Sequence, residues 1–334
     1  MADQTAEEIA TAYYRQQQLT TRLAAEQAQA AWRMVDIAAL DESWRAAAPA
    51  LVQSVIAGQR RAAVPADGYI TAVVEADGAV SEPAGRVAVE AFVGRAADGR
   101  SLSSLLYEPV IETRWRLAAG QSAPEALRGG LASLIRKVGT EVPDAGREAT
   151  GVSLAGNRRA RGYVRVLNPP SCARCAILAS REFAFNQGFA RHPRCDCVHM
   201  PITHGTVFRG RTVNAQDYFG GLSRAEQDRV FTQAGAQAIR DGADINSVVN
   251  ARRGMYTAEA YGQKLRSTYD ATSPRGTFFR SEWLRARERG LIPRNLDRRQ
   301  FRLTAHRLLP DEIYRRAGNR DELIAMLRRY GYLT

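Results

Sequence analysis

Apolar residues recur every three to four positions along most of this chain, which is the spacing of one face of an α-helix. The pattern predicts two long helices between residues 5 and about 61, before the turn-forming stretch 65–68. Residues 69–75 alternate instead like a short strand, and Asp77-Gly78 supplies a turn after it. Helical spacing then returns over residues 87–93, 101–119, 122–138 and 144–154.

Capping residues support several of the predicted helices. Ser122 with Glu125 and Ser223 with Glu226 have capping-box spacing, and the second box opens a helix that is expected to run to residue 240. Asn319 can cap the last helix in the same way. A strand is expected over 163–167, and further helices are expected over 244–253, 280–289, 310–316 and 319–329.

The sequence therefore predicts a mainly α protein with small β elements, an α+β fold class. Breaks in the pattern divide the chain into five expected segments. They are a helical arm (1–66), a helical domain with a short β-hairpin (67–160), a Cys/His knuckle module (161–215), an αα-hairpin (216–270) and an Arg-rich helical tail (271–334).

Charge is distributed unevenly along the 334 residues, whose net charge is +12 and whose pI is about 10.0. Residues 155–215 hold ten arginines against two acids, and residues 275–334 hold fifteen against seven. This excess points to a polyanionic partner, with nucleic acid first and an anionic membrane surface second. Arginine suits phosphate because its planar fork binds two oxygens, although a GC-rich coding sequence would also favour arginine over lysine.

The candidate nucleic-acid contacts are the arginines in and around the knuckle module. A protein that docks on phosphates in this way would bind DNA without reading its sequence. The predicted contacts are Arg158, Arg159, Arg161, Arg174, Arg191, Arg194, Arg209 and Arg211.

All four cysteines lie within residues 172–197, as Cys172-x2-Cys175 and Cys195-x-Cys197. Two pairs of soft ligands about twenty residues apart can close a tetrahedron around a structural zinc ion. The single-residue spacing of the second pair strains the loop, so His192 is an alternative fourth ligand, and His199 also lies within reach. Two disulfides are the competing interpretation, and a catalytic zinc is weakly supported because carboxylates are scarce here.

Several enzyme motifs are absent from the sequence. It has no phosphate-binding Gly-x4-Gly-Lys-Ser/Thr loop, no Gly-x-Gly-x2-Gly fingerprint and no His-Glu-x2-His zinc-protease motif. Ser101, Ser103 and Ser104 are expected to start a helix, and a serine protease would need them as nucleophiles beside a histidine. Residues 223–253 have the pattern of an ordinary αα-hairpin. A helix-turn-helix that reads DNA has the same pattern and is the functional alternative. The sequence therefore favours a protein that is not an enzyme.

The cysteine segment resembles a known family. Cys172-Ala-Arg-Cys175 is followed by His192-Pro-Arg-Cys195-Asp-Cys197 and then Pro201. This pattern is similar to the MuF-like minor head proteins of tailed bacteriophages, whose hallmark is Cys-x2-Cys, then His-Pro-x-Cys-x-Cys and shortly afterwards a proline. Other stretches resemble the versions carried by phages of actinobacteria, namely residues 98–106, 144–147, 235–244 and 313–318.

The resemblance implies a low-copy minor capsid protein that acts in head morphogenesis. It would bind near the portal on the capsid interior, with the portal protein, other head proteins and packaged double-stranded DNA as partners. No run approaches eighteen apolar residues, so we expect no membrane partner and a soluble protein made in the host cytoplasm. Related phage genes are often labelled capsid maturation protease, and a sequence-specific DNA-binding regulator is the other alternative.

Overall fold

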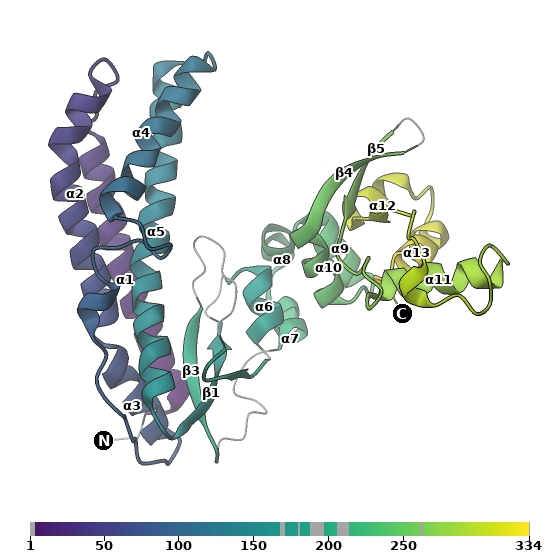
Figure 1. The fold of residues 1–334 in the computed structure, drawn as a ribbon, viewed down its shortest axis with the longest axis horizontal. Coiled ribbons are helices and arrows are strands. Elements are labelled where there is room, and N and C mark those ends of the chain that lie inside the picture. Colours follow the sequence, from purple (N-terminus) through teal and green to yellow (C-terminus); the bar gives the residue numbers. More distant parts are fainter. Residues whose placement is uncertain are drawn as a thin grey trace. The chain divides into compact units, whose positions relative to one another are not determined.

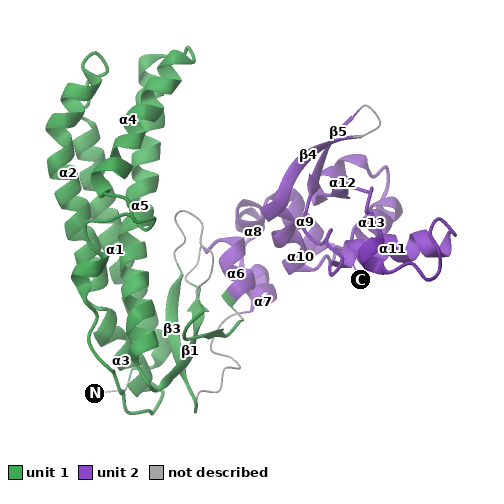
Figure 2. Cartoon of the chain, in the orientation of Figure 1, with its two compact units in different colours: residues 1–169, 179–212 green, residues 170–178, 213–334 purple. Residues whose placement is uncertain are grey.

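The computed structural model describes residues 4–167, 171–179, 181–187, 197–205, 214–260 and 263–333. The chain forms two compact units (Figure 2). Unit 1 comprises residues 1–169 and 179–212, and unit 2 comprises residues 170–178 and 213–334. This division differs from the five expected segments, because the predicted knuckle module 161–215 contributes residues to both units.

Long helices that lie side by side form the body of unit 1 (Figure 1). Thr5 opens the first of them with a capping box, and Ser122 opens the last with the box that the sequence predicted. Their buried faces form one apolar core, in which the Trp32 and Trp44 rings meet edge to face with centroids 5.9 Å apart. The helical segments are α1 (Ala6–Trp32), α2 (Leu40–Ala63), α3 (Ala66–Ala76), η1 (Val89–Phe92), α4 (Leu102–Ala118) and α5 (Ala123–Gly156).

Two predictions for this region were wrong. The predicted strand 69–75, and with it the β-hairpin, is helix α3, whose buried Ile70, Val73 and Val74 lie on one face at helical spacing. Its run of β-branched residues suggested a strand, but burial against α1 and α5 selects the helix. The predicted break before residue 144 is also absent from the described helix, since α5 continues through Pro143.

A small antiparallel sheet completes unit 1. Its order is β2-β1-β3, with β1 (Ala160–Val166), β2 (Phe183–Ala184) and β3 (Val198–Thr203). β1 confirms the strand expected over 163–167. One face of β3 presents Val198, Met200 and Ile202 to a second apolar core that includes residues of α1 and α3. The sheet is thereby fixed to the helical body.

Unit 2 combines short helices with a second antiparallel sheet of order β4-β5-β6. The sequence predicted one helix from the capping box at Ser223 to residue 240, but the structure has two helices there. The first ends where Thr232 adopts a φ of +68°, and the Thr232 side chain caps the second. The helical segments are α6 (Ala173–Ala179), α7 (Ala215–Gly221), α8 (Arg224–Phe231), α9 (Gln233–Arg240), α10 (Ile245–Ala251), η2 (Arg252–Gly254), α11 (Thr277–Glu288), η3 (Arg298–Gln300), α12 (Pro310–Arg316) and α13 (Arg320–Arg329). The strands are β4 (Met255–Ala260), β5 (Gln263–Thr268) and β6 (Arg307–Leu308).

The fold class is as predicted, mainly α with small β elements. The sequence did not predict the β4–β5 hairpin, because its strands carry charged and polar residues on the side that stays exposed. Within the described residues, none of the helices combines the length and the apolar character that crossing a membrane requires.

Candidate anchoring site of the cysteine segment

The second cysteine pair leads directly into strand β3. Cys197 is fully buried immediately before the strand, and His199, its second residue, is 5% exposed. His199 lies opposite Arg165 of β1 in the antiparallel register. The His199 ring also packs against the Tyr163 ring with centroids 4.5 Å apart. The start of β3 is therefore held from the side by β1.

Two side chains from the helices hold the backbone of the same stretch. The Tyr69 hydroxyl of α3 donates to the His199 carbonyl at 2.7 Å. Arg147 of α5 donates from Nε to the Cys197 carbonyl at 3.3 Å, and its Nη1 pairs with Asp144 Oδ1 at 2.7 Å. Because Asp144 and Arg147 are one helical turn apart, the carboxylate can orient the guanidinium. We call these contacts the β3 anchor.

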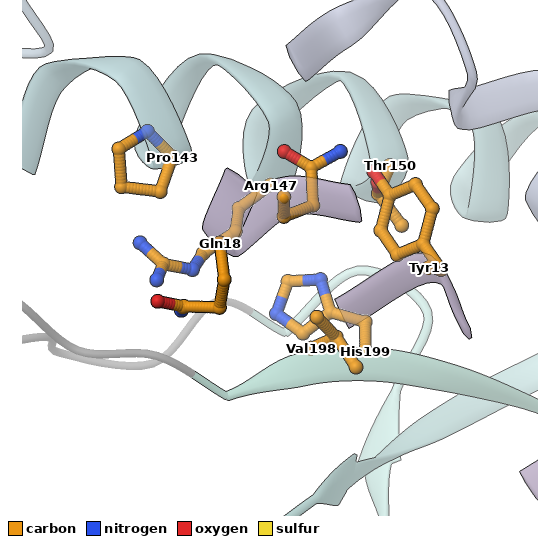
Figure 3. A pocket seen from close by; sticks show the side chains of 8 residues that line it. Tyr13, Gln18, Pro143, Arg147, Thr150, Val198 and His199 are labelled. Carbon is orange, nitrogen blue, oxygen red and sulfur yellow. The ribbon is translucent and has the colours of Figure 1, made fainter. Parts of the chain in front are cut away.

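A small polar pocket lies beside the β3 anchor (Figure 3). Its volume of about 10 Å³ is near the space that a single water molecule needs. The Thr150 hydroxyl donates to the Gly146 carbonyl at 2.7 Å, so it accepts from the Tyr13 hydroxyl at 2.9 Å. Side chains from α1, α5 and β3 line the pocket: Tyr13, Gln17, Gln18, Pro143, Arg147, Thr150, Val198 and His199. A space of this size suits packing and hydrogen bonding, and it is too small for a substrate.

Burial reinforces the neutral state of the two tyrosines at this site. Burial raises the pKa of the Tyr69 phenol well above its ordinary value, and the neighbouring Tyr13 phenol raises it further. The pKa of Tyr13 is raised by burial as well, against opposing contributions from Thr150 and Arg147. Their rings stack with centroids 4.0 Å apart. Both phenols therefore stay neutral at physiological pH and act as hydrogen-bond donors.

The first cysteine pair belongs to unit 2, at the start of α6. The Cys175 backbone N–H donates to Cys172 Sγ at 3.3 Å, which is a contact that supports a thiolate at the first cysteine. The Tyr218 hydroxyl donates to the Ser171 carbonyl at 2.7 Å and fixes the chain just before the pair. Of the remaining predicted ligands, Cys197 belongs to unit 1, while Cys195 and His192 lie outside the described residues.

The predicted phosphate-binding arginines differ in their surroundings. Arg158 is exposed, whereas Arg159 forms an ion pair with Glu82. Arg161 pairs with Glu182 at 2.8 Å, so a phosphate would have to compete with a carboxylate there. Arg174 donates to Asn250 Oδ1 at 3.1 Å within unit 2. The other four, Arg191, Arg194, Arg209 and Arg211, lie outside the described residues.

The residues on which the protease and the DNA-binding regulator alternatives depend also have local structural roles. Ser101 is the N-cap of α4, and its side chain accepts from the Ser104 N–H, as expected for a helix start. In the 223–253 hairpin, α10 buries four of its seven residues. Arg252 at its end donates to Thr232 Oγ1 at 2.6 Å, so that of the pair Arg252 and Arg253 only Arg253 is exposed.

Sequence reasoning missed most of the β3 anchor. The pattern predicts a strand at Tyr69, and it places Tyr13 in a long helix without marking it out. A usable signal was the pair Asp144 and Arg147, whose spacing of three residues places opposite charges on one helix face. The sequence did not show that this face would meet the cysteine segment, because that segment comes fifty residues later.

Replacing Tyr69 by phenylalanine tests the β3 anchor. We expect the free energy of unfolding of unit 1 to fall by about 1–2 kcal/mol, because the buried His199 carbonyl loses a donor. Amide hydrogen exchange in 198–203 should also accelerate. The matched control is Tyr107→Phe, which removes contacts to Asp41 and Arg114 near the surface and should cost about 0.5 kcal/mol or less. Equal exchange rates in β3 for the two variants would contradict the anchor.

The fold is that of a mainly α protein in which buried side chains hold the chain at Cys197 and His199. Comparison with protein families shows the group to which it belongs. The VG15 protein family matches residues 4–220, well over half of the chain. The chain therefore belongs to the VG15 family, a family of phage proteins. No curated protein and no solved structure matches it. The family match spans unit 1 and ends in α7, so residues 221–334 lie beyond it.

Proposed function

We propose that this phage protein is a structural minor head protein, of the kind its cysteine motif resembles. It would reside inside the capsid near the portal, contact the portal protein and other head proteins, and take part in head morphogenesis. Membership of a phage family supports a virion role. The net charge of +12 supports residence next to packaged DNA, where arginines can bind phosphates without reading sequence.

The β3 anchor is the observation that carries this proposal. Buried tyrosine and arginine side chains hold the backbone at Cys197 and His199, and the adjoining pocket has room for about one water molecule. Such an arrangement fixes Cys197 and the start of β3 to the helical body of unit 1. It favours a scaffold for assembly over a reaction centre.

We further propose that the cysteine segment holds a structural zinc ion. The ligands would be Cys172, Cys175, Cys195 and Cys197, with His192 as the alternative to one of the last two. The donor set fits zinc, since thiolates are its preferred structural ligands. The N–H···S contact between Cys175 and Cys172 fits too, because such bonds stabilise metal-binding thiolates. Zinc would supply a cross-link that the short segment cannot obtain from a core of its own.

Intact particles test the role and the metal together. Purified, nuclease-treated virions are expected to contain this chain together with about one zinc ion per copy. Virions carrying Cys172→Ser and Cys175→Ser should lose that zinc, while Ser171→Ala at the neighbouring position should keep it. Absence of the chain from particles would overturn the head-protein role. Zinc-free particles whose cysteines are oxidised in pairs would overturn the metal site and favour disulfides.

A further inference from the structure

Unit 2 contains a groove that the family match does not cover. It lies between α11, the segment that follows α11, and α13, and its volume is about 410 Å³. That is within the range of binding pockets for small ligands or peptide side chains. All of its lining residues fall between 282 and 329, beyond the last matched residue at 220.

Helix α11, which forms one wall of the groove, is poorly covered by the rest of unit 2. Its buried residues are Phe278 and Phe279, both in the first turn. Just after the helix, Leu291 lines the groove and is 72% exposed. A helix of this length is marginal in water without an apolar face to bury. The end of this wall therefore presents apolar surface that a bound segment could cover.

The charges in the groove are unbalanced. Arg285, Arg289 and Arg329 line it together with a single carboxylate, Glu282. Glu282 accepts from Arg285 at 2.9 Å and lies 3.9 Å from Arg329, so it neutralises part of the charge of these two arginines. Among the described residues, Arg289 has no ion pair, and it is exposed. The groove thus has a net positive wall that complements carboxylates.

Apolar side chains form another part of the lining. Leu291 and Phe301 face the same groove as the arginines. Phe301 is fixed by an edge-to-face contact with Phe279, whose ring centroid is 5.4 Å away. The lining is therefore amphipathic, with guanidinium groups and a preformed apolar surface side by side.

We propose that this groove binds a peptide segment of a partner protein that is rich in acidic residues and leucine. Carboxylates of the segment pair with Arg289 and Arg329, and its apolar side chains cover Leu291 and Phe301. Duplex DNA matches the groove less well, because phosphate contacts bury no apolar side chains in a recess. The proposal goes beyond the head-protein role and does not depend on it, since it rests on residues of unit 2 alone.

Binding of synthetic peptides to the full-length protein tests the groove. The probe is a short fluorescent peptide built of Glu-Leu repeats, measured by fluorescence anisotropy at about 0.15 M salt, where long-range attraction is screened. Two matched peptides replace every Glu by Gln or every Leu by Ser. We expect each to bind at least about tenfold more weakly, because each removes one half of the complementary chemistry. Equal binding of all three peptides would overturn the proposal.

Paired variants locate the binding on the protein. Arg289→Glu should weaken the Glu-Leu peptide at least about tenfold, and Leu291→Ser about fivefold. Two controls make the same changes at exposed residues outside the groove lining, Arg299→Glu in unit 2 and Leu19→Ser in unit 1, and should change affinity by less than about twofold. Thermal melts should be the same for all four variants.

Two results would overturn the proposal at this step. The first is an equal loss of affinity in the groove variants and their controls, which would indicate general charge attraction. The second is tight binding of oligothymidine that depends on Arg289 while the peptide fails to bind. That outcome would assign the groove to single-stranded nucleic acid instead.

Discussion

Replacing Arg307 by methionine is expected to lower the free energy of unfolding of unit 2 by about 3 kcal/mol. Removing one partner of a buried ion pair has an effect of this size because the other charge stays buried and unpaired. The Arg307 side chain is fully buried in β6. Its Nη1 pairs with Asp270 Oδ2 at 2.6 Å, and its Nε donates to the Tyr330 carbonyl at 2.8 Å. Its Nη2 donates to Ser247 Oγ at 2.9 Å, and the guanidinium carbon lies 4.4 Å from the centre of the Tyr332 ring.

These contacts join α10, the segment after β5 and the residues that follow α13 through one side chain. Methionine preserves most of the volume but leaves the Asp270 carboxylate and several carbonyls without this donor. Hydrogen exchange resolved by peptide should show faster exchange throughout unit 2 and unchanged rates in α5 of unit 1. The exposed Arg299→Met is the control and should change stability by about 0.5 kcal/mol or less. Equal effects of the two substitutions would refute the role assigned to Arg307.

Two glycines of α5 are expected to respond to alanine with opposite signs. A Cβ at Gly130 would lie 2.1 Å from Thr113 Oγ1 and 2.4 Å from the Trp32 ring. Neither neighbour can withdraw easily, because Thr113 donates to the Pro109 carbonyl at 2.8 Å and Trp32 Nε1 donates to the Leu127 carbonyl at 3.1 Å. Gly130→Ala should therefore destabilise unit 1 by about 3 kcal/mol, the upper part of the range for overpacked cores.

Gly139 lies in the same helix, and a Cβ there would have no atom of another segment within 4 Å, so alanine fits without a clash. Gly139→Ala should stabilise unit 1 by about 0.5–1 kcal/mol, because alanine favours the helix and restricts the unfolded chain. Urea unfolding followed by tryptophan fluorescence measures both variants, since Trp32, Trp44 and Trp115 all lie in unit 1. Shifts of the same sign in the two variants would contradict the packing described around Gly130.

Local sequence signals predicted most of the helices. The capping boxes at Ser122 and Ser223 and the cap at Asn319 are confirmed, because each depends on residues three positions apart. The strand 163–167 is confirmed for a similar reason, since its alternation is local. The helix α3 was missed because its β-branched residues favour a strand when burial on a helix face is unknown.

The candidate site was predictable only in part. The sequence pointed to the cysteine segment and its histidines, and β3 does place Cys197 and His199 in a buried, fixed position. It did not reveal the partners of that position, because Tyr69 and Arg147 come from helices far away along the chain. The number of arginines likewise did not show which of them can reach a partner, because composition does not distinguish the buried Arg307 from the exposed Arg299.

Composition and short-range spacing were enough to predict the mainly α fold class, several helix starts, the excess of positive charge and the concentration of cysteines within 172–197. These are properties of composition or of short-range spacing, which any segment expresses before it packs. Packing in three dimensions was needed to show which helix faces meet, that Tyr69 and Arg147 hold the start of β3, and that Arg307 is enclosed. Those outcomes depend on contacts between residues distant in the chain, whose burial no local pattern encodes.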